Sequence, residues 1–167
     1  MIWLLGFTPL LVWLYLLFGR GMFWMTRERD DRDAPLPATW PSVVAVVPAR
    51  DEADVISRTL GSLVTQDYKG SLRVILVDDQ SGDDTAAVAR ALNSDRLTVM
   101  SGVERPAGWT GKLWAVKQGV TEAGSPDYLW LTDADIAHTN NNLSKPVARE
   151  EAGKLVVTIV PSFAERY

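Results

Sequence analysis

Two carboxylates stand one residue apart, in Asp133-Ala-Asp135, directly after the short apolar run of residues 128–131. Carboxylates this close repel each other unless protons or a cation intervene. Their oxygens are the ligands that Mg²⁺ and Mn²⁺ prefer, and such a cation also neutralises a phosphorylated ligand. We therefore predict a divalent metal site at Asp133 and Asp135. The alternative is a helix-capping aspartate beside a surface aspartate.

Two further apolar runs also end in polar residues. Residues 43–47 lead into Pro48-Ala-Arg-Asp-Glu52, and residues 74–77 lead into Asp78 and Asp79. In an open parallel sheet the carboxyl ends of the strands lie along one edge, and ligands bind at that edge. The three runs together therefore predict one polar site at that edge of a sheet.

Each of these segments has a purely structural alternative. The helix predicted after Pro48 offers free backbone N–H groups to a negative ligand, and Arg50 can add charge or stack on a base. The alternative is that Asp51 and Glu52 only complement the helix dipole. One aspartate of residues 78–83 can accept a hydrogen bond from a nucleobase, or the segment is only a turn that starts a helix.

Lys112 follows a glycine-rich turn at the start of a predicted helix, where it is well placed for a diphosphate. The segment is not a P-loop, because Pro106 and Leu113 stand at positions that require Gly and Ser or Thr. No GxGxxG fingerprint is present. The single histidine, His138, is a metal ligand, an acceptor contact or neither.

The hydrophobic periodicity predicts alternating strands and helices, hence an α/β fold with a mostly parallel sheet flanked by helices. The predicted strands cover residues 42–47, 72–77, 97–100 and 128–131. The predicted helices cover about 53–65, 84–92, 112–123 and 143–152, and an apolar run follows at 155–160.

Residues 2–18 carry no charge, and the apolar character continues to residue 25. This length approaches the roughly 20 residues that span a bilayer. We predict an N-terminal transmembrane anchor at 1–25, a charged and proline-rich linker at 26–41, and a folded domain at 42–167. The alternative for the first segment is a buried N-terminal helix.

Basic residues lie on one side of the apolar run only, at Arg20, Arg27, Arg29 and Arg32. The positive-inside rule then places the folded domain in the cytoplasm. The absence of cysteine agrees with a reducing compartment. A net charge of −4 and the lack of a Lys/Arg stripe argue against a nucleic-acid partner.

Taken together and in this order, the motifs resemble a family 2 glycosyltransferase with the GT-A fold, the Rossmann-like fold of nucleotide-diphospho-sugar transferases. The longer strings are most similar to the membrane-anchored, hopene-associated glycosyltransferases of bacteria. These strings are residues 20–24, 40–50, 108–115 and 131–138.

The resemblance implies a role for each motif. The nucleotide-sugar would be held by Pro48, Ala49, Arg50, Glu52, Asp79, Lys112 and Asp133. Asp135, with Asp133, would bind Mg²⁺ or Mn²⁺ at the diphosphate. The reaction would move a sugar from a UDP- or GDP-linked donor to a lipid acceptor of the hopanoid type, with inversion at the anomeric carbon, at the bacterial inner membrane.

Enzymes of this type continue well past the second aspartate, whereas this sequence ends at Tyr167. We therefore expect residues 42–167 to be an incomplete, donor-binding part, and no catalytic base is assigned. One alternative is a membrane protein that binds a nucleotide-sugar without turnover. Another is a phosphatase of the haloacid-dehalogenase type, which would need Thr or Val where Ala137 stands and leaves Asp78 and Asp79 unexplained.

Overall fold

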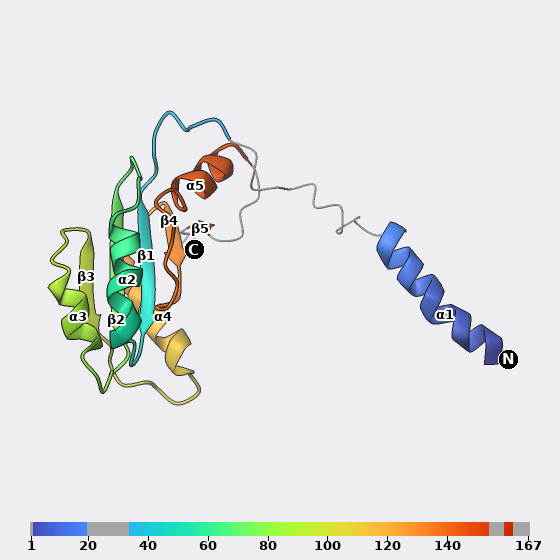
Figure 1. The fold of residues 1–167 in the computed structure, drawn as a ribbon, viewed down its shortest axis with the longest axis horizontal. Helices are drawn as coiled ribbons and strands as arrows, with labels where there is room; N and C mark the ends of the chain where they lie inside the picture. Colours follow the sequence, from blue (N-terminus) through green and yellow to red (C-terminus); the bar gives the residue numbers. More distant parts are fainter. Residues whose placement is uncertain (1, 20–33, 154–158, 162–167) are drawn as a thin grey trace. The chain divides into compact units, whose positions relative to one another are not determined.

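The computed structural model describes residues 2–19, 34–153 and 159–161 of the chain (Figure 1). The chain divides into two compact units, residues 1–33 and 34–167. In the first unit, helix α1 (Ile2–Leu14) continues into a π-helical turn, η1 (Tyr15–Gly19). None of the helices in the described ranges combines the length and apolar character needed to cross a membrane. Residues 20–25 of the predicted anchor lie outside those ranges, so the anchor stays a prediction.

The second unit is built on a five-stranded sheet in the order β3-β2-β1-β4-β5. Its first four strands are parallel and the fifth is antiparallel to β4. This arrangement confirms the predicted α/β class. The strands are β1 (Val43–Ala49), β2 (Leu72–Asp78), β3 (Leu97–Ser101), β4 (Tyr128–Leu131) and β5 (Ile159–Pro161). The helices are α2 (Ala53–Val64), α3 (Thr85–Ala91), α4 (Gly111–Ala123) and α5 (Ser144–Glu151).

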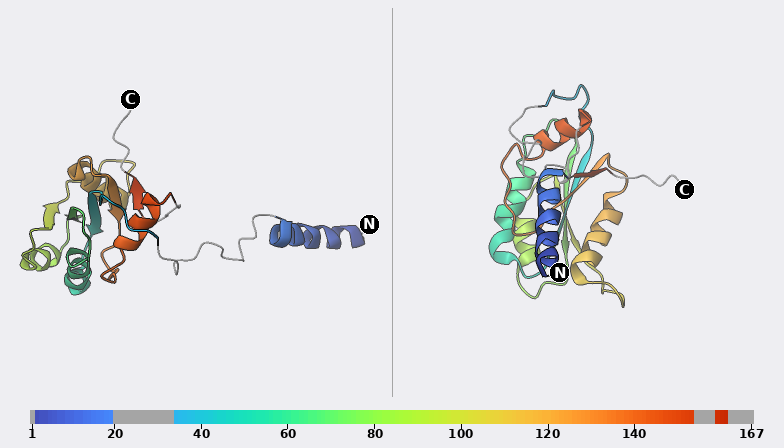
Figure 2. Two further views of the ribbon diagram at one scale, coloured as in Figure 1. Left: turned by 90° about the horizontal axis from the view of Figure 1, so that it is seen from above. Right: turned by 90° about the vertical axis from the view of Figure 1, so that its right-hand side faces the viewer.

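The helices cover the two faces of the sheet unequally. Helix α4 lies on one face, and α2, α3 and α5 lie on the other (Figure 2). Alternate residues of β1 divide between the two layers, because successive strand residues point to opposite faces. Val43, Ala45 and Val47 pack with α2 and α5, and Val44 and Val46 pack with α4.

Helix α4 approaches the sheet unusually closely at Gly119. A Cβ atom there would lie 2.4 Å from Cγ1 of Val46 and 2.9 Å from Cγ2 of Val77. Ordinary carbon contacts are about 3.5–4.0 Å. Any larger residue at this position requires a neighbour to shift, so Gly119 allows α4 to lie this close to β1 and β2.

The structure moves the end of β1 past the predicted one: Pro48 and Ala49 belong to β1 and do not open the following helix. Proline cannot donate a hydrogen bond within a sheet. The Val46 carbonyl accepts from the Thr132 N–H, so Val46 faces β4. Pro48, two residues later, faces the same side. The last β1–β4 pair is Val46 with Leu131, so Pro48 lies beyond the paired region and its missing N–H leaves no gap.

Candidate functional site

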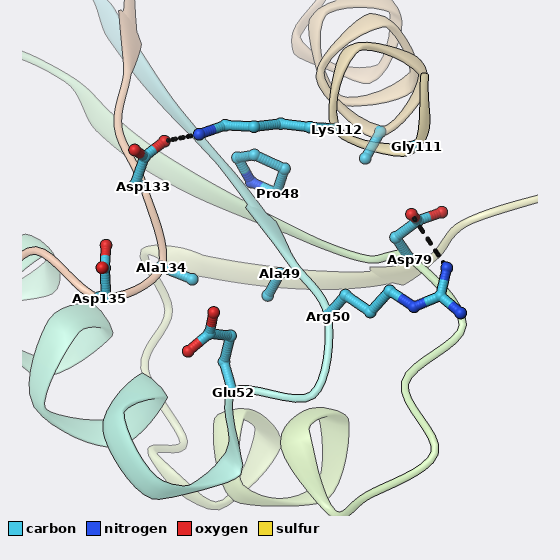
Figure 3. Close-up of a pocket in the computed structure, with 11 residues that line it drawn as sticks. Pro48, Ala49, Arg50, Glu52, Asp79, Gly111, Lys112, Asp133, Ala134 and Asp135 are labelled. Atoms are coloured by element: carbon cyan, nitrogen blue, oxygen red, sulfur yellow. Dashed lines mark ion pairs between the residues drawn. The ribbon is translucent and has the colours of Figure 1, made fainter. Parts of the chain in front are cut away.

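A cavity of about 380 Å³ opens at the carboxyl edge of the sheet (Figure 3). Ligand pockets in proteins typically have volumes of about 300–1,000 Å³. All the residues predicted to hold donor or metal line it, and they come from four separate segments of the chain. They are Pro48, Ala49, Arg50, Glu52, Asp79, Lys112, Asp133 and Asp135. The structure therefore brings these residues together, while their binding roles stay predictions.

Three small residues also line the cavity and were not predicted as part of it: Gly111, Ala115 and Ala134. Gly111 and Ala115 are four residues apart, so they share one face of α4. That spacing of small residues at a helix start is the signal that could have indicated a wall of the site.

The loop after β1 takes its shape from the loop after β2. The Asp51 N–H donates to Oγ of Ser81 at 3.0 Å, and Oδ1 of Asp51 accepts from the Gly82 N–H at 2.6 Å. Asp51 and Gln80 both have left-handed backbones, with φ of 55° and 58°. Such backbones are uncommon outside glycine and persist where surrounding contacts hold them.

The first turn of α2 is capped by Asp83 of that second loop and by Thr85, the first residue of α3. The Glu52 N–H donates to Oγ1 of Thr85 at 2.8 Å, and the Ala53 N–H donates to Oδ2 of Asp83 at 3.1 Å. The hydrogen bond from the Thr85 hydroxyl, together with those from backbone N–H groups, lowers the pKa of Asp83. The prediction that the free N–H groups of this helix start receive a negative ligand is therefore wrong for Glu52 and Ala53. Their N–H groups already have acceptors.

Adjacent aspartates at the end of β2 have different surroundings. Oδ1 of Asp78 accepts from the Ser81 N–H at 3.2 Å, which closes a turn. Asp79 is buried, lines the cavity and has its Oδ2 atom 3.9 Å from Nη1 of Arg50. A Cβ atom at Gly111 would lie 2.9 Å from the same Oδ2 atom. Asp79 is thus the aspartate available to a ligand, and Gly111 leaves room for its carboxylate.

Lys112 reaches across the cavity to Asp133, with Nζ 2.6 Å from Oδ1 (Figure 3). The two side chains are 63% and 48% exposed. Exposed ion pairs contribute little to stability, so a ligand can replace this one at small free-energy cost. Asp135 also lines the cavity and makes no hydrogen bond or ion pair with another described residue.

Asp133 and Asp135 are the residues of the cavity that are predicted to bind a metal ion. The described residues contain no group of three or more His, Cys, Asp or Glu side chains that could hold a metal ion. Mg²⁺ is usually bound by one or two carboxylates together with substrate phosphates. Asp133 and Asp135 therefore fit a cation that is shared with a phosphorylated ligand, and not one enclosed by protein ligands alone.

His138 has no place in the cavity wall. Its Nε2 and Nδ1 atoms are each 2.8 Å from a partner, Oγ1 of Thr132 and Nδ2 of Asn142. Its backbone N–H donates to Oγ of Ser62, and its ring contacts that of Trp130 with centroids 4.7 Å apart. Burial lowers the pKa of His138. The sequence left three alternatives open for His138: a metal ligand, an acceptor contact or neither. The geometry favours the last, because His138 connects the loop after Asp135 to α2 through Ser62.

Residues 44–166 match the family model described as Glycosyl transferase family 2. The "4,4'-diaponeurosporenoate glycosyltransferase" of Staphylococcus aureus strain RF122 is 31% identical to this chain over 134 residues. That alignment covers 80% of this chain and 34% of the relative. The chain thus spans about a third of the length of the curated relatives it matches.

Solved structures give the same fold. The mannosyltransferase PcManGT of Pyrobaculum calidifontis, in complex with GDP-Man and Mn²⁺, has a TM-score of 0.61 and 28% identity, covering 80% of this chain and 38% of that one. TarS of S. aureus has a TM-score of 0.56 and 24% identity, covering 67% of this chain and 20% of that one. These similarities confirm the predicted GT-A-like architecture of the second unit.

Proposed function

Because this chain belongs to glycosyl transferase family 2, we propose that it forms the donor-binding part of a glycosyltransferase that moves a sugar from a nucleotide-diphospho-sugar to a lipid acceptor at a membrane. One observation carries the proposal. The residues predicted to hold the donor, drawn from four segments of the chain, line a single cavity.

One side of the cavity suits a nucleobase and the other suits a diphosphate with its metal ion. Asp79 can accept a hydrogen bond from the N–H of a nucleobase, and the Arg50 guanidinium can stack on a base. Lys112 can leave its ion pair with Asp133 and pair with the diphosphate instead. Asp133 and Asp135 would hold Mg²⁺ or Mn²⁺, and the Mn²⁺ bound with GDP-Man in the similar mannosyltransferase supports a metal of this kind. When bound, the cation supplies positive charge that stabilises the departing diphosphate.

In the proposed reaction, the acceptor hydroxyl oxygen forms a bond to the anomeric carbon as the bond from that carbon to the diphosphate oxygen breaks. The anomeric centre inverts, and the hydroxyl proton passes to a general base. None of the described residues is assigned as that base. Arg50 and Lys112 bind and orient the donor, and Lys112 adds a positive charge beside the leaving group.

The lipid acceptor is supported by the S. aureus relative, which is named for transfer to 4,4'-diaponeurosporenoate, a carotenoid acid. A hopanoid-type acceptor is the narrower proposal and rests on the sequence strings alone. The N-terminal anchor and a cytoplasmic domain at the bacterial inner membrane rest on the charge pattern. Sedimentation of the expressed chain with membranes after alkaline carbonate tests the anchor, and release into the soluble fraction would count against it.

Calorimetric titration of the full chain with UDP and GDP, with Mn²⁺ or with chelator, tests the site. We expect binding that requires Mn²⁺, and a loss of roughly tenfold or more in Asp135→Asn, since even outer-sphere partners of metal ligands have effects of this size. Asp95→Asn, an exposed aspartate at the opposite edge of the sheet, is the matched control. Equal affinity with chelator would refute the assignment.

A nucleotide-sugar-binding protein without turnover is the second candidate. Transfer of radiolabelled sugar from UDP- and GDP-sugars into extracted membrane lipid separates the two. Transfer that disappears in Asp135→Asn supports the enzyme, whereas nucleotide binding without transfer supports the binding protein. The phosphatase alternative has no support from the family match.

A further inference from the structure

Figure 1 shows the segment that connects β3 to α4. This segment and the first turn of α4 carry exposed apolar side chains. Val103 is 60% exposed, Trp109 40% and Leu113 59%. Trp114 joins them: its ring lies 5.4 Å from that of Trp109, and its Nε1 donates to the Val103 carbonyl at 3.1 Å. We call these four residues the Trp109 surface.

The Trp109 surface takes no part in the core. The residues of α4 that are buried are Ala115, Gly119 and Ala123. Single exposed apolar residues are common, but a cluster of large ones marks a contact site. The Trp114 indole N–H is already satisfied within the cluster. The partner therefore meets mainly apolar ring and aliphatic surface.

The charges around this cluster indicate what the partner is. Arg105, Lys112 and Lys117 are exposed and basic, and Glu104 is the one acidic residue among them. The segment is thus positively charged in a chain whose net charge is −4. Lys112 is paired with Asp133. The Arg105 guanidinium donates to the Trp109 carbonyl, which places its charge beside Trp109, and Lys117 is exposed.

Tryptophans with basic residues beside them are typical of a membrane–water interface. Indole rings are enriched at the headgroup level, and an anionic leaflet attracts nearby Lys and Arg. We propose that the Trp109 surface docks on the surface of a bilayer that contains anionic phospholipids. Its place next to Gly111 and Lys112, which line the cavity, would hold the mouth of the cavity at the membrane. The inference rests on the proposed function in that the acceptor is taken to be a lipid.

The chain has no cysteine, so single labelling sites can be introduced cleanly. The full chain carrying Val103→Cys is labelled with a polarity-sensitive fluorophore and reconstituted with vesicles of phosphatidylcholine and phosphatidylglycerol. Asp95→Cys, on the opposite edge of the sheet, is the matched control. We expect a blue shift and quenching by nitroxide-labelled lipid for the Val103 probe and neither for the Asp95 probe.

A second comparison tests the charge argument. Lys117→Gln removes one basic residue beside the Trp109 surface, and Lys69→Gln removes one from the α2–β2 connection at the opposite edge. We expect Lys117→Gln to lower the ratio of docked to undocked protein by roughly fivefold, the effect of one basic residue at an anionic surface. Lys69→Gln should leave it unchanged. Vesicles of phosphatidylcholine alone should weaken docking in the parent chain as well.

The inference is overturned if the two probes are quenched equally. It is also overturned if the Val103 probe shifts in detergent without lipid as protein concentration rises, since a second copy of the chain would then cover the surface. Calorimetric titration of the same labelled proteins with nucleotide is read separately. Docking that fails while nucleotide binding persists contradicts this inference alone, and nucleotide binding that fails contradicts the proposed function.

Discussion

Replacing Gly119 by alanine sets two effects of opposite sign against each other. Alanine is favoured over glycine in a helix interior by about 1 kcal/mol. At Gly119, however, the added Cβ would lie 2.4 Å from Cγ1 of Val46. Because carbon contacts need about 3.5–4.0 Å, either α4 or the valine must move by roughly 1 Å.

The structure indicates that the steric effect prevails. Val46 is fully buried on a strand with a neighbour on each side, and its branched side chain has little rotamer freedom. Adding a methylene to a well-packed core typically costs about 1–3 kcal/mol. After subtraction of the helix-propensity gain, we expect Gly119→Ala to lower the free energy of unfolding by up to about 2 kcal/mol.

Gly61 in α2 provides the matched control, because a Cβ atom there meets nothing within 4 Å. We expect Gly61→Ala to raise the free energy of unfolding by up to about 1 kcal/mol. Both variants change a helical glycine to alanine, so the difference between them isolates the steric effect. Denaturant unfolding followed by circular dichroism measures both.

A double-mutant cycle identifies the contact itself. Val46→Ala removes the methyl group that the new Cβ would meet, so in the Gly119→Ala background it should destabilise less than it does alone. If Gly119→Ala stabilises the protein as much as Gly61→Ala does, the close approach of α4 to the sheet is refuted as the reason for this glycine.

Three further outcomes are expected. Gly111→Ala should weaken nucleoside diphosphate binding without loss of stability, because its Cβ would lie 2.9 Å from Oδ2 of Asp79; calorimetry and unfolding measure the two effects. Burial lowers the pKa of His138 from 6.5, so the unfolded chain takes up the proton first as the pH falls. The contribution of neutral His138 to stability is therefore present above pH 6.5 and is lost as the pH falls through the lower pKa of the folded protein. His138→Gln should remove this decline below pH 6.5 in denaturant titrations. Lys112→Met should weaken nucleoside diphosphate binding in the presence of Mn²⁺, as measured by calorimetry. It should also raise the Mn²⁺ affinity of the nucleotide-free protein, as measured by electron paramagnetic resonance, because Asp133 loses its ion-pair partner.

Strands β1–β4 and helices α2–α5 could be predicted from hydrophobic periodicity, with ends within about two residues. Strand β5 begins at Ile159, near the end of the apolar run at 155–160. The errors have a common cause. Strands β1 and β2 run on to Ala49 and Asp78, which pair with each other. Backbone pairing does not depend on whether a side chain is apolar, so an apolar run marks the buried part of a strand and not its end.

The membership of the candidate site was predictable because the carboxyl ends of parallel strands share an edge. Which of these residues face the ligand and which only shape the loops was not predictable. Asp78 and Asp79 are adjacent and chemically identical. They differ in the folded chain, where Asp78 closes a turn with Ser81 and Asp79 lines the cavity near Arg50. The capping of α2 by Asp83 joins residues 30 positions apart. Pairings of this kind depend on the folded arrangement and leave no local signal in the sequence.

The capping of α2 by Asp83 and Thr85 also affects how the chain acquires this site during synthesis. Glu52 leaves the ribosome 33 residues before Thr85, whose hydroxyl accepts its N–H. Until then the first turn of α2 has no partner for that donor, and Asp51 has no Ser81 to hold its left-handed backbone. The β1 side of the cavity therefore cannot reach its final shape before the segment through Thr85 has emerged, so the Arg50 and Asp79 sides of the cavity become ordered together.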